Sequence, residues 1–396
     1  MLSLELLPAA HGDSILIEYG SSKQPNRILI DGGPAHAYEA GLRRRLDLLP
    51  PKKREVELMV VTHIDADHID GALILLQDQG LNLRYKEFWF NGWEQLAKFK
   101  GDTYAPLQGE FLGGLIKNDP HLLTVWNQQF KKGPVVVPDN KPLPTYTLEG
   151  GARITLLGPD DSALRRLRAR WKSAIRDFEP GDAAEALRRL KDRREYRPPT
   201  TPAVYAARQY GADRSPANGS SISFVLEYEG VSLLLLGDAH AHTLAASLQR
   251  LATQRAVERL SFDAIKLPHH GSMGNVSAAW LRLVETKRWL ISTNGAVFNH
   301  PDTETALLIA DQAPNGKKPT IYCNYENEIT ARLKNHPEST RWITIYPKSR
   351  TQGPVGGLLL QWPDAIPPTA SVTRPKKGMT EAKGRKPSRK GRGGTT

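Results

Sequence analysis

Four side chains that could bind a metal stand within six residues of one another: His63, Asp65, Asp67 and His68. Imidazole and carboxylate groups together suit zinc, manganese or iron, and the lack of thiolates argues against a closed structural zinc site. The spacing therefore predicts a metal centre, and a dinuclear centre is the leading hypothesis. The alternative is a solvated acidic loop that caps the following helix.

The flanking residues indicate which elements must position these side chains. Residues 56–61 are typical of a buried strand, and apolar residues return after His68 with helical spacing. The four candidate ligands are therefore expected on a strand-to-helix loop. Such a loop can turn them towards one point, whereas a continuous strand would send alternate side chains to opposite faces.

Two later apolar segments also end in candidate ligands. Residues 232–236 lead into Gly237 and Asp238, and residues 263–268 lead into His269 and His270. If these strand ends meet the first cluster at one rim, the side chains satisfy the geometric demand of two metals ~3.5–4 Å apart.

The order of the blocks resembles the metallo-β-lactamase superfamily of hydrolases, whose His-x-[His/Asp]-x-Asp-His loop matches residues 63–68. The resemblance is closest to the hydrolase domain of ComEC-type DNA-uptake proteins and to its free-standing relatives. Further matching blocks lie at 11–17, 29–33, 218–221, 268–272 and 299–301, so the resemblance covers residues 1 to about 362 apart from two insertions. The motifs are specific for fold and metal chemistry, and less so for substrate.

The resemblance implies an α/β fold, an αββα sandwich with two divalent metals at one rim. Asp67 would ligate a metal, orient the nucleophile and accept its proton, and Asp238 would bridge the metals. The last ligand would be His269 or His270, and the other imidazole of the pair could contact a leaving group or phosphate. His300 is a candidate for the same work, with a helix-entry role before Pro301 as the rival interpretation.

Two further carboxylates, Asp13 and Asp31, are expected to contact the metal ligands and orient them, with turn formation as the alternative. Two divalent metals make a bridging water a hydroxide near neutral pH, polarise the electrophile and hold the leaving oxygen. Hydrolysis is the reaction that this arrangement implies.

The chain departs from the superfamily pattern in two places. Asp65 stands where most members carry a second His, a change shared by the ComEC-like branch, and the harder ligand makes Mn²⁺ a rival to Zn²⁺. The superfamily's mid-chain His has no counterpart, because the matching block contains Asn218, Ser220 and Ser221. The metal held by His63 and Asp65 is therefore expected to bind more weakly, completed by water or by Asn218, or to be only transiently bound. Asn218 and Ser220 are also candidates for binding substrate or for orienting the ligands.

Composition sets the remaining limits. The chain has 396 residues, 39% of them hydrophobic, which is enough for a substantial core. Its one cysteine excludes an internal disulfide framework, and no apolar run reaches the ~18 residues of a membrane span. These features predict a cytoplasmic protein that has no membrane partner, and they leave its oligomeric state open. We expect one hydrolase domain over 1–363 with insertions at about 92–147 and 160–215.

The net charge of +12 is concentrated at the C-terminal end. From Arg374 onwards there are nine Lys or Arg residues against one acid, Glu381, which leaves about +4 for the rest of the chain. Residues 364–396 are also nearly free of apolar side chains and are predicted to be disordered. This basic tail is either a tether for nucleic acid or another acidic partner, or a solubilising terminus.

Both insertions have two interpretations. Residues 164–171 and 184–191 have amphipathic spacing with many basic residues, which predicts two helices broken at Pro180 and Gly181. They would form a lid or substrate platform, or a solvated helical hairpin. The insertion at 92–147 places aromatic residues in predicted loops, where they would stack on bases or cover a sheet edge.

The coarse pattern predicts strands and helices throughout the domain. Strands are expected near 2–7, 14–19, 27–31, 56–62, 85–90, 152–157, 221–229, 231–237, 262–267, 288–293, 319–323 and 356–362. Helices are expected near 69–78, 242–254, 277–286 and 302–312.

Three function classes follow from these observations. The leading one is a metal-dependent phosphodiesterase or nuclease, with nucleic acid or another phosphodiester as substrate. The second is a hydrolase of a small ester, lactone or thioester. The third is a regulatory module whose incomplete metal site no longer turns over.

Overall fold

The computed structural model describes residues 1–96, 107–174, 178–197, 215–313, 317–347 and 356–363. Residues Met1–Pro363 form one compact unit. The predicted basic tail at 364–396, and the parts of the predicted insertions at 97–106, 175–177 and 198–214, lie outside the described residues.

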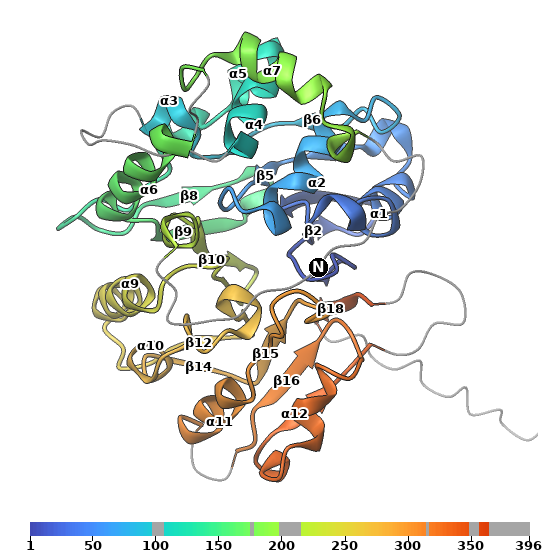
Figure 1. Ribbon diagram of the computed structural model, residues 1–396. Helices are drawn as coiled ribbons and strands as arrows, with labels where there is room; N and C mark the ends of the chain where they lie inside the picture. The colour runs from blue at the N-terminus through green and yellow to red at the C-terminus, as the bar shows by residue number, and fades with distance from the viewer. Residues whose placement is uncertain (97–106, 175–177, 198–214, 314–316, 348–355, 364–396) are drawn as a thin grey trace, which may run out of the picture. The chain divides into compact units, whose positions relative to one another are not determined.

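Two large sheets form the centre of this unit (Figure 1). The six-stranded sheet has the order β18-β1-β2-β3-β5-β7, with β18 Leu358–Trp362, β1 Leu2–Leu6, β2 Ile15–Ser21, β3 Gln24–Ile30, β5 Leu58–Val60 and β7 Phe88–Trp89. The eight-stranded sheet has the order β17-β16-β15-β13-β11-β10-β9-β8, with β17 Ile343–Ile345, β16 Thr320–Cys323, β15 Arg288–Ile291, β13 Ala264–Lys266, β11 Val231–Leu235, β10 Ser223–Tyr228, β9 Arg153–Gly158 and β8 Thr145–Thr147.

Two pairs of short parallel strands extend this core. They are β4 Glu55–Val56 with β6 Arg84–Tyr85, and β12 Leu260–Phe262 with β14 Val284–Thr286.

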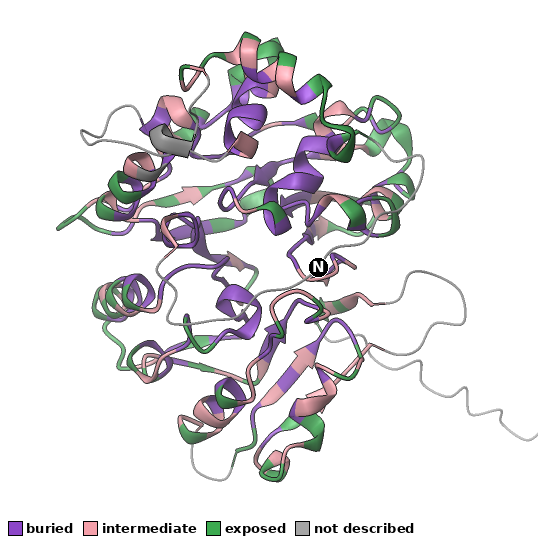
Figure 2. Cartoon of the chain, in the orientation of Figure 1, coloured by how far each residue is buried: buried purple, intermediate pink, exposed green. Residues whose placement is uncertain are grey.

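Alternation along the strands of the six-stranded sheet decides which layer each side chain joins. In β2, Ile15 and Ile17 belong to the core that includes the eight-stranded sheet, whereas Leu16 belongs to a second core under the helices. In β3, Ile28 and Leu29 divide in the same way. Most residues of these two strands are accordingly buried (Figure 2). The sheet is covered on each side, which is the condition for a sandwich.

Helices complete the outer layers. On the six-stranded sheet they are α1 Arg44–Asp47, α2 Ala66–Gln77, α4 Leu107–Asn118, α5 Pro120–Val125, α6 Asp161–Ala174 and α7 Ala183–Lys191, with the short α3 Trp93–Leu96. On the eight-stranded sheet they are α9 Ala241–Gln254, α10 Ala278–Leu281, α11 Thr303–Asp311 and α12 Ala331–Asn335. The short α8 Pro216–Gly219 precedes β10 and contributes Ala217 to the second core. The predicted αββα class is confirmed by these layers.

Two predicted elements need correction. The helix expected at 277–286 stops at Leu281, and Val284–Thr286 instead form strand β14, which pairs with β12. The aromatic-rich insertion, predicted as loops, contains the twelve-residue helix α4. Both errors have the same cause: the local sequence pattern was ambiguous, and long-range strand pairing and burial decided the secondary structure of each segment.

The basic helices α6 and α7 are packed elements and not a solvated hairpin. Leu164, Leu167 and Trp171 of α6 and Leu190 of α7 are buried in the second core. The Trp171 indole donates to Glu110 of α4 at 2.6 Å. Within the described residues, no helix has the length and apolar character needed to cross a membrane.

Candidate metal centre

The loop that follows β5 delivers the first group of candidate ligands. His63 lies three residues beyond the strand, and Asp65 stands in extended conformation as the N-cap of α2. The Asp65 carbonyl accepts from the amides of His68 and Ile69, both at 3.0 Å, so the helix begins at Ala66. Asp67 and His68 therefore occupy the first helical turn, three residues earlier than the sequence pattern predicted.

The segment before β2 packs directly against this turn, and Gly12 makes the approach possible. A Cβ atom at Gly12 would stand 1.8 Å from the carbonyl oxygen of Asp67, so any side chain there would force the two segments apart. The Asp13 amide donates to the same carbonyl at 3.2 Å. This contact brings His11 and Asp13 to the cluster.

The Asp238 carboxylate, two residues past Leu236, lies at the centre of the cluster. Its Oδ2 is 3.3 Å from Nε2 of His68, 4.0 Å from Nε2 of His63 and 3.8 Å from Nε2 of both His269 and His270. Four imidazoles from two separate segments therefore direct the same ring nitrogen at one carboxylate.

Each of these imidazoles is oriented through its other nitrogen. His68 Nδ1 donates to Asp31 Oδ2 at 2.8 Å, and His270 Nδ1 donates to the Ser292 carbonyl at 2.7 Å. His269 Nδ1 meets Asn275 Oδ1 at 2.8 Å, and the Asn275 amide donates to the backbone carbonyls of residues 238 and 239. Nδ1 of each ring is therefore a donor, which leaves Nε2 facing the cluster. In the metal-free state Nε2 of His270 donates to Asp67, and a bound metal would replace that proton.

His63 is oriented in the same way, through the Thr62 hydroxyl. The Thr62 hydroxyl donates to Asp31 Oδ2 at 2.7 Å, so at 3.0 Å it accepts from His63 Nδ1. Ser221 Oγ, which accepts the Asp238 amide at 3.1 Å, also lies 3.2 Å from His63 Nδ1. Asp31 thus orients His68 directly and His63 through Thr62.

The cluster passes a direct test of fitness for a cation. Nε2 of His63, Nε2 of His68 and Oδ1 of Asp238 are buried and make no hydrogen bond among the described residues. Buried polar atoms are normally satisfied, so three unsatisfied atoms of metal-ligand type in one place indicate a missing partner. Ligand atoms ~2.0 Å from a tetrahedral metal lie ~3.3 Å apart, close to the His68–Asp238 separation. Three sets of ligand-type atoms gather here: His63 with His68 and Asp238, Asp67 with His68 and His270, and Asp13 with Asp31 and His68.

The charges of the cluster favour a cation as well. Burial would raise the pKa of Asp238, but the charges of His68, His270 and His269 hold it well below its usual value. Burial also opposes ionisation of Asp67, whose pKa is nevertheless lowered by His68 and by the hydrogen bond from His270 at 3.2 Å. Both carboxylates are therefore ionised. Burial lowers the pKa of His63 to about 3, so that imidazole is neutral and able to ligate.

The backbone at the last pair of imidazoles is unusual. His269 and His270 have φ angles of 46° and 56°, a left-handed conformation that is costly for residues with a Cβ. This conformation lets two consecutive side chains reach the cluster. Nε2 of both predicted candidates for the final ligand, His269 and His270, therefore lies 3.8 Å from Asp238 Oδ2.

The remaining predicted residues lie at different distances from the centre. Asp65 Oδ2 is 3.7 Å from His63 Nε2, and its side chain is 41% exposed. Asp13 accepts from Lys266 at 2.5 Å and lies 3.4 Å from His270 Nδ1. His300 is buried beside His269, with ring centroids 5.3 Å apart, and its Nδ1 meets Asp302 at 3.2 Å.

The block at 218–221 contributes differently from the prediction. Ser220 Oγ donates to the Ala217 carbonyl at 2.6 Å, which is a role within α8, and it is Ser221 that reaches His63. Asn218 is buried in the same short helix. Thr62, Asn275 and Ser292 were not predicted, because small polar residues beside a motif carry no sequence signal for which way they point.

The layers and the cluster together define an αββα protein with a buried His/Asp site suited to divalent metal. No protein-family model and no curated protein matches the chain. Among solved structures, a Parabacteroides distasonis protein assigned as a metal-dependent hydrolase shares 10% identity, covering 86% of this chain and 91% of its own at a TM-score of 0.33. Zn²⁺-bound PqqB from Methylobacterium extorquens shares 11% identity, covering 90% of this chain and 99% of its own at a TM-score of 0.35.

A third solved structure is a Thermotoga maritima protein assigned to the Zn-dependent hydrolases of the metallo-β-lactamase superfamily. It shares 12% identity and covers 82% of this chain and 77% of its own, at a TM-score of 0.25. Likeness at this level carries nothing about activity, so the function proposed below rests on the residues of the cluster.

Proposed function

We propose that the protein is a metal-dependent hydrolase of phosphodiesters, belonging to the ComEC-like branch of the metallo-β-lactamase superfamily. The observation that carries the proposal is the convergence of four oriented imidazoles on the ionised Asp238, with three buried donor atoms left unsatisfied. A purely structural cluster has no reason to leave those atoms without partners.

Two divalent cations would divide the ligands between them. His63 and Asp65 would hold one, Asp67, His68 and one of His269 and His270 would hold the other, and Asp238 would contact both. When bound, such cations supply Lewis acidity and charge neutralisation for an attacking water and a departing oxygen.

The chain itself supplies the proton acceptor. Asp67 is ionised, buried and fixed in the first turn of α2, with its Oδ2 3.2 Å from His270. A carboxylate in this position orients an attacking water and accepts its proton. The Asp67 side chain has few alternative positions, because Gly12 packs against its backbone.

Imidazole and aromatic side chains also lie beside the cluster. His11 packs edge-on to Phe298 with ring centroids 5.7 Å apart, and Phe298 lies 6.3 Å from His269 and 6.5 Å from His300. Imidazole N–H groups can donate to phosphoryl oxygens, and the rings offer a flat surface to an aromatic leaving group or base. This environment and the overall positive charge favour a phosphodiester, such as nucleic acid, over a neutral ester.

The test is a substrate comparison on protein stripped of metal and reloaded with Zn²⁺ or Mn²⁺. Bis-p-nitrophenyl phosphate is expected to be hydrolysed faster than p-nitrophenyl acetate or a thioester. Mn²⁺ is expected to support turnover at least as well as Zn²⁺, because Asp65 makes one site rich in oxygen. Faster ester cleavage in every metal form would exclude the phosphodiester assignment, and full metal content without any turnover would indicate a regulatory module.

Two substitutions tie the activity to the cluster. Asp67→Ala and Asp238→Ala are each expected to lower turnover to a few per cent or less. Both variants should retain their far-ultraviolet circular dichroism, since neither side chain supports a core strand. Asp78→Asn is the matched control, because Asp78 is a buried carboxylate that pairs with Tyr38 and Arg43 and contacts no candidate ligand in the described structure.

A further inference from the structure

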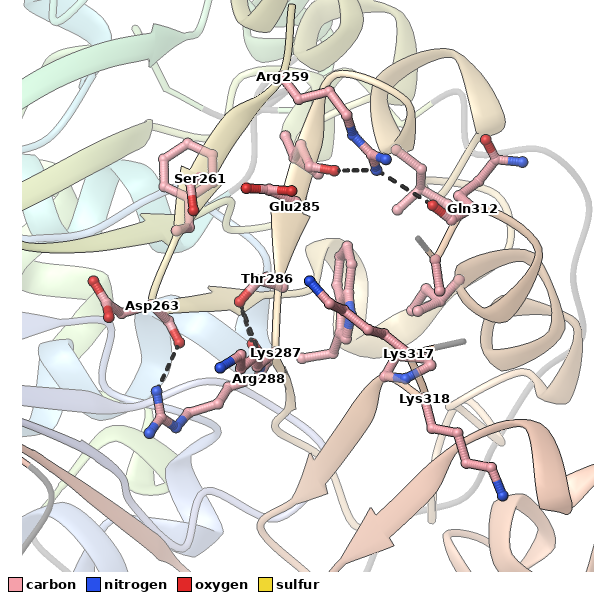
Figure 3. A pocket seen from close by; sticks show the side chains of 17 residues that line it. Arg259, Ser261, Asp263, Glu285, Thr286, Lys287, Arg288, Gln312, Lys317 and Lys318 are labelled. Carbon is pink, nitrogen blue, oxygen red and sulfur yellow. Dashed lines mark hydrogen bonds between the residues drawn. The ribbon is translucent and has the colours of Figure 1, made fainter. Parts of the chain in front are cut away.

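A cavity of about 300 Å³ (Figure 3) lies in the eight-stranded sheet at the amino-terminal ends of its parallel strands. The metal cluster lies at the carboxy-terminal ends of the same strands. The walls of the cavity include Asp263, Arg288 and Pro319, which stand at or just before the starts of the parallel strands β13, β15 and β16. His269 and Ser292 follow the opposite ends of β13 and β15. The cavity is therefore separate from the candidate metal centre.

The floor of the cavity is apolar. It is formed by Phe262 of β12, Val284 of β14, Trp289 of β15 and Ile309 of α11, all of which also belong to the core. These side chains are at most 5% exposed, so the floor is a rigid surface with defined shape. Apolar walls with a few polar groups at the edge are typical of small-molecule sites, and 300 Å³ is at the lower end of their size range.

Two arginines of the wall are held in place by the fold. Arg259 donates from Nη2 to the backbone carbonyls of Val284 at 2.6 Å and Gln312 at 3.3 Å. Arg288 donates to the Asp263 carbonyl at 3.3 Å, and its guanidinium lies 5.6 Å from the centre of the Trp362 ring. Arg259 makes no ion pair among the described residues, so its guanidinium leaves positive charge at the wall.

Three lysines add mobile charge at the rim. Lys287, Lys317 and Lys318 are exposed and make no ion pair among the described residues. Figure 3 shows the Lys317 side chain extending across the cavity, whereas Lys318 turns away from it. The only acidic side chains of the described wall are Asp263 and Glu285, and Asp263 already accepts the Ser232 amide at 2.9 Å. Positive charge therefore exceeds negative charge around an apolar floor.

We propose that this cavity binds a small organic phosphate, with its ring or apolar part on the floor at Trp289 and Phe262 and its phosphate at Lys317 and Lys287. The combination selects such a ligand for two reasons. A neutral apolar molecule would leave the lysines uncompensated, and free phosphate would leave the floor bare. The inference does not depend on the proposed hydrolase activity, because no residue of the metal centre takes part in it.

The probe is adenosine 5′-monophosphate, titrated calorimetrically into full-length protein that has been freed of metal on a chelating resin. Removing metal prevents the phosphate from binding at the His/Asp cluster. The nucleotide is expected to bind with one-to-one stoichiometry, and adenosine and inorganic phosphate are each expected to bind at least about tenfold more weakly.

Two variants locate the binding. Lys317→Glu is expected to weaken nucleotide binding by about tenfold or more, whereas Lys334→Glu, an exposed charge reversal on α12 away from the cavity, changes it less than about twofold. Ala313→Phe fills the cavity without changing charge and is expected to abolish binding while circular dichroism stays unchanged.

Several results would overturn the proposal. They are no nucleotide binding at millimolar concentration, equal losses in Lys317→Glu and Lys334→Glu, or unchanged affinity in Ala313→Phe. If inorganic phosphate bound as tightly as the nucleotide, the apolar floor would contribute nothing to binding. That result would also reject an organic phosphate as the ligand. None of these results depends on hydrolysis, so failure here is distinguishable from failure of the proposed activity.

Discussion

Replacing Asp31 by asparagine tests whether the cluster is organised for metal. Asp31 is fully buried, and its Oδ2 accepts from both His68 Nδ1 at 2.8 Å and the Thr62 hydroxyl at 2.7 Å. Asparagine conserves the shape and can keep the Oδ1 bond from the Thr62 amide at 2.8 Å. It must then place an NH₂ group opposite two donors, which disturbs His68 directly and His63 through Thr62.

The expected magnitude follows from that double role. Removing one partner that orients a metal ligand typically costs 10–100-fold in metal affinity, and Asp31 orients two imidazoles. We therefore expect a loss of about 100-fold, equivalent to ~2.7 kcal/mol. Metal-free stability should change much less, because burial opposes ionisation of Asp31 and raises its pKa despite the hydrogen bonds that it accepts.

The assay is competition with a chromophoric chelator for Mn²⁺ and Zn²⁺, accompanied by thermal unfolding of metal-free protein. Asp78→Asn again provides the matched control, since it neutralises a buried carboxylate that accepts from Tyr38 at 2.7 Å. Metal affinity in Asp31→Asn within about twofold of the parent, or an equal loss in Asp78→Asn, would refute the orienting role.

Three further predictions concern the rest of the molecule. Burial raises the pKa of Glu87 from 4.5 to about 7, so the folded state binds this proton more tightly than the unfolded state and stability falls as pH rises from about 4.5 to 7. In chemical denaturation of metal-free protein, the unfolding free energy of Glu87→Gln should fall by ~1–3 kcal/mol less over this pH range than that of the parent. Parallel pH profiles of the two proteins would contradict this prediction. Trp171→Ala should lower the unfolding free energy by ~3–5 kcal/mol if α6 is packed in the core. A loss below ~1 kcal/mol would show that α6 is instead a solvated helix. Truncation after Pro363 removes nine basic residues and should weaken nucleic-acid binding and flatten its salt dependence without changing turnover of a small phosphodiester; unchanged affinity would make the tail a solubility feature.

Much of the site could be predicted because its residues stand at strand ends. His63, Asp238 and His269 each follow a short apolar run, and such runs are recognisable from local sequence. The orienting partners could not be predicted in the same way. Ser221 and not Ser220 faces His63, and a one-residue choice of this kind depends on a turn geometry that composition does not encode.

The sequence by itself determined the classes of side chain, their order and the alternation that sorts Ile15 from Leu16 into different layers. These properties depend on covalent order and on the two-residue period of a strand. Only the tertiary structure decided that four imidazoles share Asp238, that Asp31 serves two of them, and that residues 284–286 form a strand. Those outcomes depend on contacts between segments up to about two hundred residues apart, where packing and strand pairing override local preference.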